Sequence, residues 1–204
     1  MANNLDTQVK GVPIVFYNAS GFETTDIVSI EIEAPHFPKE VTVYDEQGKK
    51  VNSQLVSYTD GNVQLLVEAT VPAVGYVVYD VRLAGSEKEM AITEATNIEN
   101  SFYKLMLDEN GDIVSLFDKK NNKELVKAGK AIRLALFTEN ESLSWPAWEV
   151  LKKTIDRTPI SITSNVKMTL CENGELRKTL CVEKSHGGSF FRQYIHLYEG
   201  ALAH

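Results

Sequence analysis

Histidines and carboxylates are the side chains of this sequence that could carry acid–base or metal chemistry. The histidines are His36, His186, His196 and His204. They lie in no HExxH sequence and have no Cys or Asp neighbours at the spacing of metal ligands, and no GxSxG, phosphate-loop or GxGxxG motif is present. We therefore expect neither a metal site nor catalytic residues. A glycosidase-type carboxylate pair stays open, because its members meet in space and 28 Asp and Glu residues allow many pairs.

Both tryptophans lie in the segment 142–149, where Pro146 argues against a central β-strand. A flat aromatic ring with polar neighbours can cap a hydrophobic core, contact another domain or stack on a sugar. We favour core capping and keep the other two interpretations open. Trp145 and Trp148 are therefore candidates for substrate binding or for a domain interface.

The segment 190–198 alternates between two kinds of side chain. Phe191, Ile195 and Leu197 form one face of a predicted strand. The other face carries an aromatic and cationic stripe, made of Phe190, Arg192, Tyr194, His196 and Tyr198. Such a stripe is unusual in water, so we expect a missing or neighbouring sheet to cover it, with a ligand groove or plain exposure as the alternatives. Arg192, Tyr194 and His196 are further candidates for substrate or interface contacts.

Strands must position these residues, because apolar side chains recur at every second position along most of the chain. Turn residues such as Asp60-Gly61-Asn62 separate the runs. Many short strands with regular turns predict an all-β protein built of sandwiches. The clearest runs lie at 28–33, 41–43, 63–67, 103–107 and 132–136.

A shift in composition divides the chain. The small and charged residues 84–89 follow an apolar run and are typical of a linker. We predict a small β-sandwich domain at 1–85, a linker at 86–96, and the beginning of a larger antiparallel β-sandwich at 97–204. Because the chain ends directly after an apolar strand, we expect this second domain to be truncated at its C-terminus.

Two hairpins have predictable registers. A three-residue loop at 109–111 pairs Leu107 with Ile113 and Tyr103 with Phe117.

The same tripeptide at 172–174 pairs Leu170 with Leu176 and places Gly174 where a bulge needs a left-handed residue. Cys181 then lies opposite Asn165, roughly 20 Å along the ladder from Cys171. That is too far for a disulfide, so we expect two buried thiols.

Charge and hydropathy exclude several partners. The formal charge is −7 and the isoelectric point is about 5.2, so nucleic acid is not an expected partner. No apolar run approaches the ~20 residues that span a bilayer, and the first residues do not resemble a signal peptide. We expect a cytoplasmic protein with no membrane contact.

Several short motifs follow one another along the chain, at 14–18, 27–28, 51–55, 71–76, 98–103, 108–119 and 147–149. Their order and spacing resemble the β-rich region that follows the catalytic domain in glycoside hydrolase family 38 α-mannosidases. The resemblance extends from about residue 12 to 200. One departure is Pro146, since family members often carry an acidic residue before the Ala-Trp pair.

The resemblance implies an enzyme that cleaves terminal α-mannosidic bonds with retention, using a carboxylate nucleophile and a divalent metal, commonly zinc. Those residues belong to the family's N-terminal α/β domain, and no position here matches them. We therefore expect an inactive fragment without a cofactor of its own, whose mutarotase-like sandwich supports the missing catalytic domain and shapes a site for mannose-containing carbohydrate.

Two alternatives stay open. A stand-alone carbohydrate-binding module would hold sugar through Trp145, Trp148 or Tyr194. A mutarotase-type enzyme would pair His186 or His196 with a carboxylate as acid and base.

Overall fold

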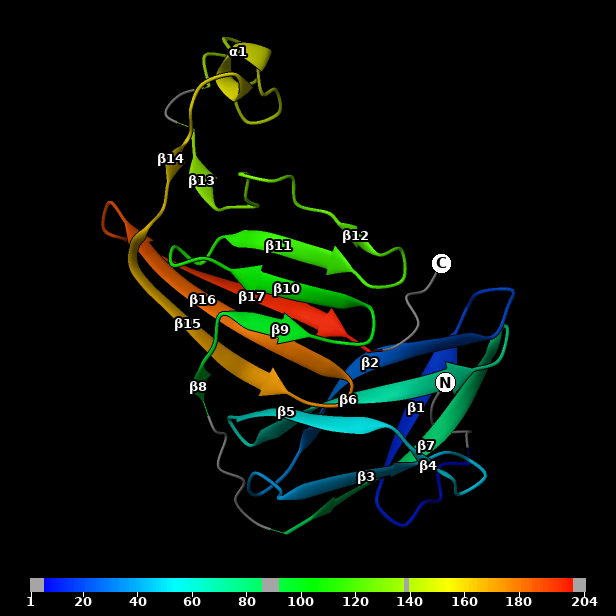
Figure 1. The fold of residues 1–204 in the computed structure, drawn as a ribbon. Coiled ribbons are helices and arrows are strands. Elements are labelled where there is room, and N and C mark those ends of the chain that lie inside the picture. The colour runs from blue at the N-terminus through cyan, green and yellow to red at the C-terminus, as the bar shows by residue number, and fades with distance from the viewer. Residues whose placement is uncertain (1–5, 86–91, 138–139, 200–204) are drawn as a thin grey trace. The chain divides into compact units, whose positions relative to one another are not determined.

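The computed structural model describes residues 6–85, 92–137 and 140–199 (Figure 1). Its sheets are antiparallel and its one short helix is α1, so the all-β prediction is confirmed. Of the described residues, 6–85, 172–178 and 198–199 form a first compact unit, and 92–137, 140–171 and 179–197 form a second. Within these ranges no helix is long and apolar enough to cross a membrane.

The first unit contains two sheets. One has the strand order β1-β7-β3-β4, formed by Val12–Asn18, Gly75–Ala84, Glu40–Tyr44 and Lys50–Val51. The other has the order β2-β6-β5, formed by Thr24–Glu33, Asn62–Val71 and Ser53–Thr59.

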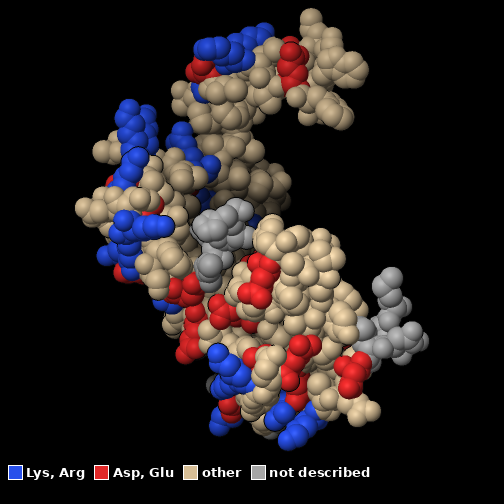
Figure 2. Space-filling view, turned by 90° about the vertical axis from the view of Figure 1, so that its right-hand side faces the viewer, with Lys and Arg blue, Asp and Glu red and all other residues tan. Residues whose placement is uncertain are grey.

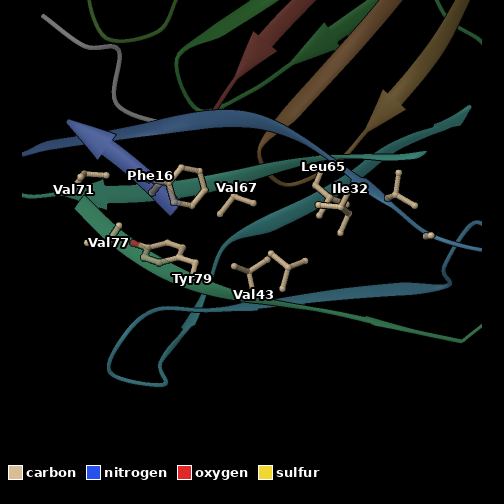
Figure 3. Close-up of a cluster of buried hydrophobic side chains, with 12 residues drawn as sticks. Phe16, Ile32, Val43, Leu65, Val67, Val71, Val77 and Tyr79 are labelled. Atoms are coloured by element: carbon tan, nitrogen blue, oxygen red, sulfur yellow. The ribbon is translucent and has the colours of Figure 1, made fainter. Parts of the chain in front are cut away.

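A hydrophobic core lies between these two sheets, because every second side chain of each strand points inward. Figure 3 shows Val43, Leu65 and Tyr79 among the side chains that converge there. The Phe16 and Tyr79 rings meet edge to face at 5.2 Å. On its other face β6 buries Leu66, which belongs to a second apolar cluster.

The second unit contains two four-stranded sheets around a core of its own, except that residues 172–173, 177–178 and 198, at the strand ends of the second sheet, belong to the first unit. One has the order β12-β11-β10-β9, formed by Lys123–Glu124, Ile113–Asp118, Tyr103–Leu107 and Asn97–Glu99. The other has the order β17-β16-β15-β8, formed by Ser189–Tyr198, Arg177–His186, Ser164–Asn173 and Thr93–Glu94.

The remaining elements form a protruding segment in the same unit. Here β13 (Ala135–Leu136) pairs with β14 (Ile160–Ser161), and α1 (Lys152–Ile155) lies between them in the chain. We call the described residues 135–137 and 140–161 the arm. Of the strand predicted at 132–136, only its end is a strand, and Ile132 makes an isolated bridge to Ile113.

The first predicted hairpin is correct at its turn and wrong further along. Leu107 lies opposite Ile113, as predicted. A register shift next to Leu107 then places Tyr103 opposite Asp118 instead of Phe117. A β-bulge adds one residue to one strand, so every later pair moves by one position.

The second predicted hairpin register is wrong by four positions. The turn occupies 174–176 rather than 172–174, and the Gly174 N–H donates to the Arg177 carbonyl at 3.1 Å. Further along, the Asn165 side chain donates to the Ser185 hydroxyl at 2.7 Å, where Cys181 was expected. Leu176 leaves the ladder because it is buried in the apolar cluster that contains Leu66.

The corrected register brings the two cysteines together. Both are free thiols, Cys181 buried and Cys171 half-buried. Burial, and then the neighbouring Cys171 thiol, raise the pKa of Cys181 to about 11. The predicted separation of roughly 20 Å is therefore wrong.

The linker predicted at 86–96 is described only in part. Residues 86–91 lie outside the described residues, and Thr93–Glu94 forms β8, which pairs with β15. The domain bounds 1–85 and 97–204 stay a prediction.

Candidate functional site

The arm holds both tryptophans in a tight turn. The Trp145 carbonyl accepts hydrogen bonds from the N–H groups of Trp148 at 3.0 Å and Glu149 at 2.8 Å. Asn140 crosses the base of the turn and donates to the Pro146 and Glu149 carbonyls. Local polar contacts therefore shape this turn.

The apolar side chains of the arm face solvent. Trp148 is 88% exposed and Trp145 is 66% exposed, so neither ring caps a core in the described structure. In α1 the buried residue is Thr154, not an apolar side chain. The other large apolar side chains exposed on the arm are Leu136, Phe137, Leu143, Val150, Ile155 and Ile160.

Most charged side chains of the arm form ion pairs with one another. Glu141 contacts both Lys153 and Arg157, and Lys152 contacts Asp156 at 2.7 Å. Figure 2 shows Lys and Arg gathered on one side of the lobe at the top of the view and mostly uncharged residues on the other, with one acidic group beside them. The arm is thus amphipathic.

Hydrogen bonds from Lys153 and Arg157, with their positive charges, lower the pKa of Glu141 to about 2 from 4.5. A lowered carboxyl pKa means that the pairing stabilises the arm above pH 4.5 and is lost as the pH falls through about 2. We predict that the Glu141 carboxyl carbon titrates near pH 2 by NMR. In the double variant Lys153→Gln/Arg157→Gln the midpoint should return toward 4.5. A midpoint near 4.5 in the unmodified chain would contradict the pairing.

The stripe on β17 is a second group of candidate residues. Arg192 donates to the Glu183 carboxylate at 2.9 and 2.7 Å. The His196 ring is hydrogen-bonded to the Thr179 hydroxyl at 2.8 Å and lies parallel to the Tyr194 ring, with centroids 6.3 Å apart. The predicted division of β17 into two faces is confirmed by the alternating burial of its residues. The five candidates therefore form two groups, the tryptophan pair on the arm and these three residues on β17.

The other described histidines lie elsewhere. The His36 ring is hydrogen-bonded to the Gly85 carbonyl at 3.2 Å, and His186 ends β16. Across 6–85, 92–137 and 140–199 no group of three or more His, Cys, Asp or Glu could hold a metal ion. The described residues do not fit the divalent metal that the resemblance implies.

A comparison with protein families shows which family the second half of the chain matches. Residues 98–203, just over half of the chain, match the family model described as "Glycosyl hydrolases family 38 C-terminal domain". The chain belongs to this family. It is also similar to the protein "Alpha-mannosidase G" of Dictyostelium discoideum, with 27% identity over 189 residues. The matched part is 85% of this chain and 16% of that protein.

The family 38 match includes the arm and the β17 stripe, since both lie between 98 and 203. The chain spans about a sixth of the length of the curated relative it matches. The resemblance found in the sequence motifs is therefore confirmed.

Sequence reasoning missed one feature of this family 38 region. Lys184 is completely buried and pairs with Asp112 at 2.5 Å inside the second unit. A signal was present, because Lys184 follows Leu180 and Val182 at the inward positions of β16. A lysine at such a position needs a buried partner.

Proposed function

We propose that this chain is a non-catalytic β-region of a family 38 α-mannosidase, which supports the catalytic part and shapes its substrate site. The observation that carries the proposal is the match of 98–203 to the family's C-terminal domain. The similarity to a Dictyostelium protein named as an α-mannosidase supports the substrate class. In this proposal the nucleophile and the divalent metal belong to the catalytic part, and the substrate is mannose-containing carbohydrate.

An activity assay tests the proposal. The purified chain, supplied with zinc, should release no 4-nitrophenol from 4-nitrophenyl α-D-mannoside above the rate in buffer. When it is mixed with the separately expressed family 38 catalytic domain from the same genome, it should bind that domain and raise its thermal midpoint. Turnover by the chain alone, with contaminating enzymes excluded, would refute the proposal. Failure to bind the catalytic domain would do so too.

The exposure of both tryptophans favours a second candidate function, a stand-alone carbohydrate-binding module. The two functions differ in how they respond to free sugar. Mannose or mannobiose should leave the tryptophan fluorescence of the chain unchanged if it is a supporting region. Saturable quenching that disappears in Trp148→Ala would favour the module instead.

A further inference from the structure

We propose that the apolar side of the arm is a docking surface for the catalytic part of the α-mannosidase, with Trp148 and Leu143 as its anchors. The inference rests on the proposed function and adds the surface through which the two parts meet. It does not concern the β17 stripe.

Burial is the first argument. Leu143 is fully exposed and Trp148 nearly so, and both lie in a turn whose shape is set by hydrogen bonds rather than by packing. Single apolar side chains on a surface are ordinary, but eight in one short arm are not. A protein partner would remove this surface from water, which is the main favourable contribution to most protein association.

The residue types and the local rigidity fit an interface. Tryptophan is enriched among the few residues that dominate binding energy. The arm's turn is already closed by the Trp145–Trp148 and Trp145–Glu149 hydrogen bonds, so docking orders little backbone. Most of the free energy gained by burying apolar area on docking is therefore available for binding.

Charge narrows the class of partner. The segment 140–161 carries three acidic and three basic residues. Five of these six pair with one another, in the pairs Lys152–Asp156 and Lys153–Glu141–Arg157. With no excess of positive charge, the arm would not be drawn to nucleic acid or to an anionic lipid surface. An apolar patch on another protein fits it best.

Effective concentration selects the catalytic part over a second copy of the chain. The chain matches 16% of a full α-mannosidase, so most of such a protein lies outside the matched region. A surface linked to the arm in one protein is present at an effective concentration in the millimolar range, whereas a second copy must be recruited from solution. The linked surface would occupy the arm first.

The test compares single alanine variants for binding to the separately expressed catalytic domain from the same genome. Trp148→Ala and Leu143→Ala should each raise the dissociation constant at least about 10-fold. Phe22→Ala is the matched control, because Phe22 is 69% exposed but lies in the first unit; its binding should be unchanged. Trp145 stays in place as a reporter, and its emission should shift to the blue on docking.

Each other outcome is decisive. If the unmodified chain binds and all three variants bind equally well, the docking surface is wrong while the proposed function stands. If the unmodified chain does not bind, the proposed function fails. A concentration-dependent dimer that Trp148→Ala dissociates would make a second copy the occupant and overturn the inference. Mannose-dependent quenching lost in the same variant would overturn it in favour of sugar binding.

Discussion

Replacing Asp112 by alanine should lower the free energy of unfolding by about 3–5 kcal/mol, because it leaves a buried ammonium group without its counter-charge. The Lys184 side chain is 0% exposed and its Nζ lies 2.5 Å from the Asp112 carboxylate. Water does not reach the Lys184 side chain, and the Asp112 side chain is only 8% exposed, so nothing replaces the lost partner. Chemical denaturation followed by circular dichroism measures the change.

An exposed ion pair provides the matched control. Asp156→Ala also removes an aspartate that contacts a lysine, at 2.7 Å, but both side chains are more than half exposed. Its effect should stay within about 0.5 kcal/mol. The double variant Asp112→Leu/Lys184→Met should recover most of the stability, because two apolar side chains need no partner. If Asp112→Ala costs no more than Asp156→Ala, the pair is not buried in solution.

Replacing Gly174 by alanine should lower the free energy of unfolding by roughly 3 kcal/mol, through the loss of the hydrogen bonds made by Gln54. A Cβ at 174 would lie 1.9 Å from the Gln54 carboxamide carbon. That carboxamide accepts from the N–H groups of Leu176 and Arg177, and donates to the Arg177 carbonyl. Expelling it would strand these buried backbone groups.

A double-mutant cycle separates this contact from backbone strain. Gly174 has no positive φ, contrary to the left-handed conformation that its turn position predicted. Once Gln54 is already alanine, Gly174→Ala should therefore cost little. Gly21→Ala serves as a control, since a Cβ there meets nothing within 4 Å. A full loss of stability in the Gln54→Ala background would show that the contact is not the cause.

The sequence alone was sufficient for the features that depend on local pattern. Alternation of apolar and polar residues places side chains on opposite faces of a strand, whatever the strand later pairs with. For this reason the all-β class and the two faces of β17 follow from the sequence. The pairing of Leu107 with Ile113 also follows, because a short loop with Gly111 at φ 69° determines the first pair of the hairpin.

The tertiary structure decided whatever depends on partners distant in the chain. Leu176 could match Leu170 across a hairpin, but the buried apolar cluster with Val56 and Leu66 takes it out of the ladder and moves the turn. Because the turn lies elsewhere than predicted, the two cysteines are neighbours and not far apart along the ladder. The burial of Lys184 beside Asp112 and the exposure of Trp148 also depend on residues that are distant in the chain. Local periodicity determines which way a side chain points, whereas only the assembled chain determines whether a partner or water meets it there.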